Sequence, residues 1–211
     1  MPLSTVLGAQ SLVQPAVCTT ATRPASPYTG QAIYDTTLSQ TLAYNGSAWV
    51  VQTGGLVLVK AQAVGTAVSS VTVTDAFSST YENYRIIYYG NSASGNNDLA
   101  VTLGSTTTGY YAALSYVTYA GAAAGAGNSN VGSWGFLGTC NTIGAFLDFD
   151  LFQPNIANET FMTFRLLGTS AGGAGSGYLN NTTQYTSFTL APAGGNTLTG
   201  GTVFVYGYAK A

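Results

Sequence analysis

Apolar residues recur with the two-residue period of β-strands along most of the chain after residue 55. No segment carries a capped pattern with the 3.6-residue period of an amphipathic helix. Turn signals separate about eight to ten such runs, which is the spacing of a β-sandwich. We therefore predict an all-β chain whose residues 56–211 form a jelly-roll-like antiparallel β-sandwich. The predicted strands include residues 56–64, 69–77, 81–90, 99–104, 134–138, 143–152 and 161–170, with one or two at 106–121 and two within 187–211.

Three glycine-rich stretches interrupt this pattern. The TGG at residues 53–55 is predicted to be a linker between two domains. Residues 121–132 and the AGGAGSG run at 171–177 are predicted to be flexible loops, because glycine and other small residues weaken a strand interior.

Residues 1–53 are predicted to form two elements. Residues 1–20 mix apolar and small polar residues without a period, and we expect an anchoring arm, extended or in a short helix. Residues 21–53 are rich in turns and are predicted to form a small β-hairpin module. Such a module has too little core to fold alone, so we expect it to pack on another copy or on the next domain.

Local signals inside residues 21–53 support a hairpin. The dipeptide Asn45-Gly46 has the composition of a type I′ turn, and Tyr44 and Trp49 flank it in positions that pair across the hairpin. In the preceding strand, Ile33 and Tyr34 are expected to lie on opposite faces.

Composition narrows the class of protein. Only 6% of the residues are charged, against about 25% in an ordinary soluble protein. A surface with so few charges suits a protein that packs against copies of itself, because few ions need desolvation at an interface. The net charge of −2 and the lack of a basic tract predict no nucleic-acid partner. No uninterrupted apolar run reaches about 18 residues, so no membrane insertion is expected.

The sequence lacks the residues and motifs that most catalytic and cofactor-binding sites require. The chain contains no histidine, which excludes histidine-dependent nucleophilic sites and histidine-ligated zinc. No nucleotide-binding fingerprint is present. The two cysteines, Cys18 and Cys140, are expected to be idle thiols, with a single disulfide left open. We predict no enzyme, no catalytic residue, no cofactor and no metal.

One acidic pair and two basic residues remain as candidate chemistry. Asp148 and Asp150 are two residues apart in a predicted strand and should point to the same face. They suit a solvent-facing stripe better than a calcium site or a glycosidase pair, because no third carboxylate is near in sequence. Arg85 and Arg165 lie in predicted strands among apolar residues, where a structural ion pair with an acid is expected.

A cluster of aromatic residues beside polar loops is the other candidate, because aromatic rings bind the apolar faces of sugars. The alternative is packing in the core or on a sheet face. The candidate glycan-binding residues are Tyr110, Tyr111, Tyr116, Tyr119 and Trp134, which flank residues 121–132.

The turn-rich segment at residues 22–49, TRPASPYTGQAIYDTTLSQTLAYNGSAW, resembles a module of structural proteins in tailed bacteriophages, especially tail-fibre and minor tail proteins. That module reads Arg-Pro-x-x-Pro-x-x-Gly-Gln, then Ile-Tyr-(Asp/Glu)-Thr, then Tyr-(Asn/Asp)-Gly-x-x-Trp. FSSTYENYRIIYYG at 77–90 and GGTVFVYGYAKA at 200–211 are similar, more weakly, to a β-sandwich domain of the same proteins. The residues that match the module and are candidates for a subunit interface are Arg23, Pro24, Pro27, Gly30, Tyr34, Tyr44 and Trp49.

The resemblance implies a homotrimer located in the virion, on the tail or the capsid surface, and made in the host cytoplasm. It implies a tail fibre whose arm at residues 1–20 attaches to another virion protein and whose sandwich binds a host-surface glycan. A capsid decoration or head-fibre protein, attached to the shell by the same arm, is the alternative. A glycan-degrading enzyme is a third hypothesis, which rests on Asp148 and Asp150 alone.

Overall fold

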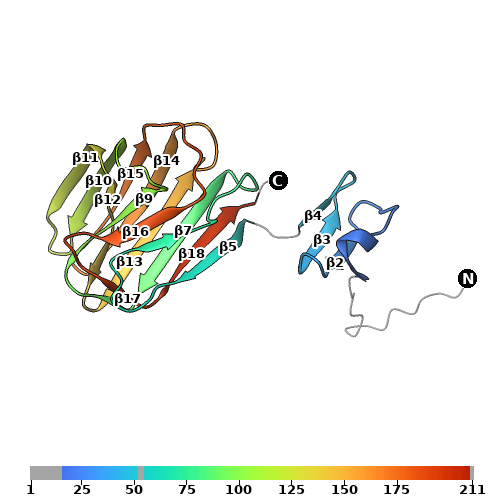
Figure 1. Cartoon of the computed structure of the whole chain (residues 1–211), viewed down its shortest axis with the longest axis horizontal. Coiled ribbons are helices and arrows are strands. Elements are labelled where there is room, and N and C mark those ends of the chain that lie inside the picture. The colour runs from blue at the N-terminus through green and yellow to red at the C-terminus, as the bar shows by residue number, and fades with distance from the viewer. Residues whose placement is uncertain (1–15, 52–54, 210–211) are drawn as a thin grey trace, which may run out of the picture. The chain divides into compact units, whose positions relative to one another are not determined.

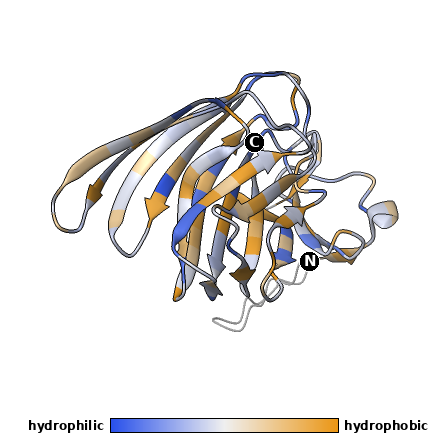
Figure 2. Ribbon diagram, turned by 60° about the vertical axis from the view of Figure 1, so that its left-hand side comes forward, coloured by the Kyte–Doolittle hydropathy of each residue, from blue (hydrophilic) through white to orange (hydrophobic). Residues whose placement is uncertain are grey.

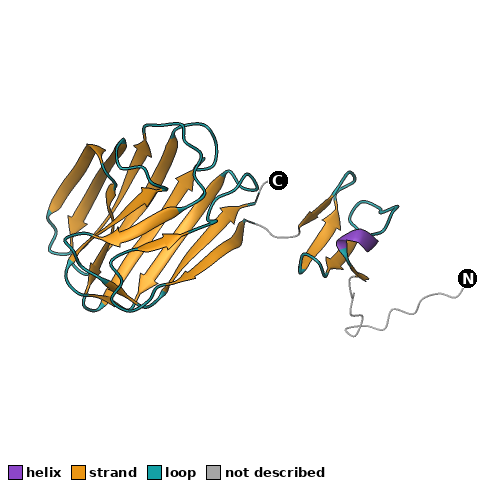
Figure 3. Ribbon diagram, viewed as in Figure 1, coloured by secondary structure: helices purple, strands orange, loops and turns teal. Residues whose placement is uncertain are grey.

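The computed structural model describes residues 16–51 and 55–209 and divides the chain into two compact units, Met1–Gly54 and Gly55–Ala211 (Figure 1). Both units are built from strands, and the only helix in the described residues is one short 3₁₀ turn in the smaller unit (Figure 3). No described helix has the length and apolar character needed to cross a bilayer. The prediction of an all-β chain is confirmed.

The smaller unit is a four-stranded sheet in the order β1-β2-β3-β4, with β1 parallel to β2 and the other pairs antiparallel. Ile33 and Leu42 lie opposite each other and are buried on one face, while Tyr34 is exposed on the other, as predicted. The elements are β1 (Ala16–Cys18), η2 (Thr20–Thr22), β2 (Ala32–Asp35), β3 (Gln40–Tyr44) and β4 (Trp49–Val51).

The expectation of a separate arm over residues 1–20 is wrong at its C-terminal end. Strand β1 pairs with β2 through hydrogen bonds, so Ala16–Cys18 is part of the small sheet. The rest of the predicted arm, residues 1–15, lies outside the described residues, as do residues 52–54 of the predicted linker.

The hairpin turn also differs from the prediction. Tyr44 pairs with Trp49, and their rings lie 5.5 Å apart, as expected. The loop between them has four residues, however, and Asn45 does not have the positive φ that a type I′ turn requires. Instead, the Asn45 side-chain oxygen accepts hydrogen bonds from the backbone N–H groups of Ser47 and Ala48, which closes the loop as an Asx turn.

The larger unit contains fourteen strands in its described residues, more than the eight to ten predicted. Two reasons are that both glycine-rich runs are strands and that several strands are too short to show a period. The strands are β5 (Leu56–Ala63), β6 (Val71–Val73), β7 (Asn83–Gly90), β8 (Ser92–Ala93), β9 (Asn97–Leu103), β10 (Tyr110–Thr118), β11 (Ala123–Val131), β12 (Trp134–Asn141), β13 (Gly144–Phe152), β14 (Thr160–Leu167), β15 (Ala171–Leu179), β16 (Phe188–Pro192), β17 (Leu198–Thr199) and β18 (Thr202–Tyr208).

Strand β13 organises the unit into two layers. One side of β13 pairs with β7 along its whole length, and the other side pairs first with β12 and then with β14. The chain of pairings therefore splits at β13. One layer runs β11-β10-β15-β14-β13-β7-β18-β5, and the other runs β12-β9-β16-β6. In Figure 1, β9 and β16 cross in front of the larger layer.

The core lies between these layers. The ring of Phe149 on β13 lies 6.4 Å from that of Phe188 on β16, and Tyr110 on β10 lies 5.1 Å from Trp134 on β12. Inward-facing residues of both layers form one continuous hydrophobic cluster. Hydrophilic residues occupy only short stretches of the strands (Figure 2), as the low charge content requires. The predicted β-sandwich is confirmed; the strand order does not by itself establish a jelly roll.

Both glycine-rich runs that were predicted to be loops are strands. Residues 123–131 form β11, at one edge of the larger layer, and residues 171–179 form β15, between β10 and β14. A Cβ added at Gly175 would overlap the ring of Phe164 and the carbonyl oxygen of Ala113. Likewise, a Cβ at Gly177 would overlap Met162. Glycine is therefore used in β15 because large core side chains of β14 fold over it.

Candidate functional site

The structure separates the five predicted glycan-binding aromatics. Tyr110 and Trp134 are buried with 0% exposure and contact each other in the core, so the prediction that they bind a glycan is wrong. The hydroxyl of Tyr110 accepts a hydrogen bond from the backbone N–H of Leu103, and the indole N–H of Trp134 donates one to the carbonyl of Tyr178. These are the partners that buried aromatic polar groups need. Tyr110 and Trp134 therefore pack in the core, which was the alternative to glycan binding.

The other three aromatics do not form one site. Tyr116 is half-buried and packs against the core. Tyr119 is 71% exposed just after β10, where its hydroxyl donates a hydrogen bond to the carbonyl of Gly168. Tyr111 lies on the outer face of the larger layer, because its neighbour Tyr110 points into the core.

Tyr111 belongs to a stack of rings that crosses three strands. Its ring centroid lies 4.7 Å from that of Tyr178 on β15, with the planes inclined by 10°, and Tyr178 lies 5.9 Å from Phe161 on β14. Cross-strand aromatic pairs stabilise a sheet, so the stack has a structural role. The Tyr178 ring therefore lies between the other two, and the residue is half-buried.

A depression of about 450 Å³ adjoins the stack on the outer face. Its floor includes Ala113, Ser176 and Thr163, which lie side by side in the register of β10, β15 and β14. A second depression with Ser115 and Ala174 in its floor adjoins the first. We call the outer surface of these five residues the trough. Since no side chain in it is larger than threonine, the trough is hollow between the taller side chains around it.

Two pairs of opposite charges close one end of the trough. A further depression of about 300 Å³ continues from Thr163 to Asp148, Asp150 and Arg165. Asp148 accepts contacts from Arg85 at 2.5 Å and from Arg165 at 3.0 Å, and Asp150 lies 3.3 Å from Arg85. The prediction that each arginine pairs with an acid is confirmed, and the structure identifies the acids as Asp148 and Asp150. We call these four residues the ion network.

Tyr208 on the C-terminal strand β18 completes the network. Its hydroxyl donates a hydrogen bond of 2.6 Å to Asp150. Burial, together with this bond to a carboxylate, raises the pKa of Tyr208 above its usual value. The phenol therefore stays protonated and keeps its donor on Asp150 at any ordinary pH.

The signal that could have revealed the trough was present in the sequence. In β15, Gly173, Gly175 and Gly177 alternate with Ala174 and Ser176, which is a two-residue period made entirely of small side chains. Because glycine weakens a strand interior, a glycine-rich run is usually predicted to be a loop even where small residues alternate. Nothing in the order of residues indicated that β15 lies between β10 and β14.

Chemically, the trough and ion network suit the binding of hydroxyl groups. Serine and threonine hydroxyls both donate and accept, arginine offers five donors, and the carboxylates accept. Both carboxylates are held by guanidinium groups. No group of three or more potential metal-ligating acidic or cysteine side chains occurs among the described residues.

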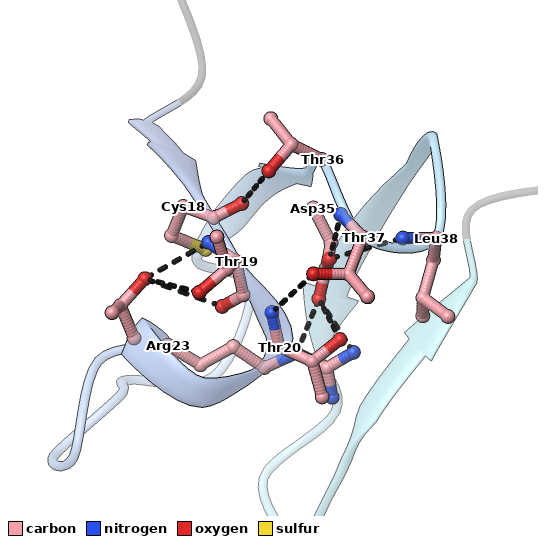
Figure 4. A network of polar contacts seen from close by, with 9 residues as sticks. Cys18, Thr19, Thr20, Arg23, Asp35, Thr36, Thr37 and Leu38 are labelled. Atoms are coloured by element: carbon pink, nitrogen blue, oxygen red, sulfur yellow. Dashed lines mark hydrogen bonds and ion pairs between the residues drawn. The ribbon is translucent and has the colours of Figure 1, made fainter.

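Of the residues predicted for a subunit interface, Arg23 contacts a buried carboxylate, that of Asp35, in the smaller unit (Figure 4). Asp35 is completely buried, and its Oδ2 lies 2.7 Å from Arg23 and accepts a hydrogen bond from Thr20. Its Oδ1 accepts from the backbone N–H groups of Thr37 and Leu38. Pro24 and Pro27 are half-buried, Gly30 has a positive φ of 87°, and Tyr34 is exposed.

Burial alone raises the pKa of Asp35, but the bonds from Arg23, Thr20 and the two backbone donors outweigh it and hold the pKa below its ordinary value. A lowered folded-state pKa stabilises the fold fully above the unfolded value of about 3.9. That stabilisation is lost as the pH falls through the folded value.

We therefore expect the smaller unit to lose stability in acid as Asp35 is protonated. Urea titrations of the full chain at about pH 6 and about pH 3, followed by the methyl NMR signals of Ile33 and Leu42, should show a lower midpoint at the acidic pH. In Asp35→Asn, which has no carboxylate to protonate at this position, the urea midpoints at the two pH values should be nearly equal. An unchanged midpoint in the wild type would contradict this role of Asp35.

Both cysteines are free thiols in the structure. Cys18 is half-buried in β1, and Cys140 is buried in β12, where burial raises the pKa of its thiol. A buried thiol with a raised pKa is a poor nucleophile, so Cys140 serves packing.

Comparisons with protein-family models, curated proteins and solved structures found no significant match to this chain.

Proposed function

We propose that this chain is a non-enzymatic structural protein of a bacteriophage particle, a tail fibre whose sandwich binds a glycan on the host surface. The observation that carries the binding role is the trough. It is an open, hydroxyl-bearing hollow beside an aromatic stack, on a rigid sheet. Sheet-borne sites hold their side chains in fixed positions, which reduces the entropy lost on binding.

Placement in a virion rests on the resemblance of residues 22–49 to the phage module and on composition. A chain with 6% charged residues has few ions to desolvate when it assembles. The smaller unit supports self-association, because Val17, Tyr34 and Val50 share one exposed sheet face that carries no charged residue. That face is the one opposite Ile33 and Leu42. The proposal that the assembly is a homotrimer rests on the resemblance alone.

The binding role is tested by filling the trough. Ser176→Trp places a large side chain on the exposed floor of the trough, and we expect the affinity for a glycan to fall at least about tenfold. Thr72→Trp, at an exposed position on β6, is the matched control and should bind as the wild type does. A glycan array followed by calorimetry on the hits measures both variants. If Ser176→Trp and the wild type bound a glycan equally well, the trough would not be the binding site.

The virion role is tested separately by locating the protein on an intact particle. A gold label on the C-terminus should appear at the tail. A label over the capsid shell would identify the alternative, a decoration or head-fibre protein, and would reject the tail-fibre assignment. No label on purified particles would reject both.

A further inference from the structure

The charges around the trough cancel one another within the ion network. Two carboxylates and two guanidinium groups contact each other, and no other charged side chain lines the trough or the depressions that continue it. Arg85, Asp148 and Asp150 have side chains that are 17%, 12% and 16% exposed, whereas Arg165 is 53% exposed. The network thus presents one accessible guanidinium that is already paired with Asp148.

A charged ligand group would meet a like charge here. An anion placed on the free N–H groups of Arg165 comes close to Asp148, which lies 3.0 Å from that guanidinium. A cation placed on Asp148 comes close to Arg85 and Arg165, because both guanidinium groups contact that carboxylate. Like charges at this range repel strongly when they are partly shielded from water, so either ion gains little.

Uncharged hydroxyl groups are not repelled by either the carboxylates or the guanidinium groups. Arg165 uses one guanidinium nitrogen for Asp148, and its other donors are available to a ligand. The register sets Ala113, Ser176, Thr163 and Asp150 in one row across four adjacent strands. With strands about 4.8 Å apart, this row extends about 15 Å, which suits a short oligosaccharide lying across the strands.

We infer that the trough takes an electrically neutral saccharide, which crosses β10, β15 and β14 and ends against the ion network. This inference rests on the proposed glycan binding and names the ligand class of the same site. Binding of a neutral ligand to a self-compensated site is insensitive to salt, because no net charge is screened.

The experiment compares trisaccharides that differ in charge. The probes are neutral trisaccharides of glucose, galactose and N-acetylglucosamine, the acidic trimer of galacturonic acid, and the cationic trimer of glucosamine. Calorimetry on the full chain is run at about 20 mM and about 500 mM NaCl. We expect at least one neutral probe to bind, with less than about a twofold change with salt, and both charged probes to bind at least about tenfold more weakly.

A charge change in the network gives a second readout. Arg165→Gln leaves the network with a net negative charge, so the variant should gain about tenfold in affinity for the glucosamine trimer, and this gain should vanish at high salt. Lys60→Gln removes a cation from β5, outside the trough, and should show no gain.

The failures are distinguishable. If the galacturonic acid trimer binds most tightly, weakens with salt and loses affinity in Arg165→Gln, then glycan binding stands and the neutral ligand class is overturned. If the glucosamine trimer is the tightest ligand of the wild type, the inference is likewise overturned. If no saccharide of any charge binds, the proposed glycan binding fails and the inference falls with it.

Discussion

Trp134→Ala is expected to destabilise the sandwich by about 3–5 kcal/mol, the usual range for deleting a fully buried tryptophan. The side chain is 0% exposed and its ring contacts Tyr110 across the two layers. Its indole N–H also binds the carbonyl of Tyr178, so the substitution removes a contact behind the aromatic stack as well. Chemical denaturation of the full chain, followed by circular dichroism, measures the loss.

Two further variants separate the core role of Trp134 from surface binding. Trp134→Phe retains most of the ring volume and should cost less than the alanine variant. Tyr119→Ala removes a ring that is 71% exposed and should cost about 1 kcal/mol or less. If Trp134→Ala and Tyr119→Ala were equally mild, Trp134 would not be the core residue described above.

Asp148→Asn is expected to destabilise the larger unit by about 2 kcal/mol, less than the loss for a fully buried ion pair, because the side chain keeps some contact with water. The substitution removes the carboxylate that faces both Arg85 and Arg165 and leaves Arg85 dependent on Asp150. Urea denaturation of the full chain measures the change.

Asp75→Asn is the matched control. Asp75 is also an aspartate with a basic partner, but its side chain is 88% exposed and lies 3.9 Å from Lys60, so its removal should change stability by less than about 0.5 kcal/mol. Equal effects of the two substitutions would show that the ion network contributes nothing beyond a surface pair.

The strands that could be predicted are those with a two-residue alternation of large apolar residues. Strand β14 illustrates this, since Met162, Phe164 and Leu166 are buried while the residues between them are exposed. Strands β11 and β15 were missed because their alternation involves only small residues. The reason for glycine in β15, the large side chains of β14 that fold over it, is a contact between strands.

The candidate site was less predictable than the strands. The spacing of Asp148 and Asp150 indicated a shared face, and the position of Arg85 and Arg165 among apolar residues indicated ion pairs. Tyr178 and Phe161, which stack with Tyr111, carried no local signal that distinguished them from core aromatics. The glycan-binding prediction is wrong for Tyr110 and Trp134 because a position beside a glycine-rich run does not make a side chain exposed, and both are buried.

The sequence by itself determined the all-β character, the scarcity of charge, the absence of histidine chemistry and the composition of the small N-terminal hairpin. These properties follow from residue type and from spacing within one strand. The tertiary structure alone decided which aromatics are buried and which strands are neighbours. It brought Arg85 to Asp148, and it placed the small residues of β10 and β15 beside Thr163. Pairing between strands that are distant in sequence depends on how the whole core packs, and no local pattern encodes that.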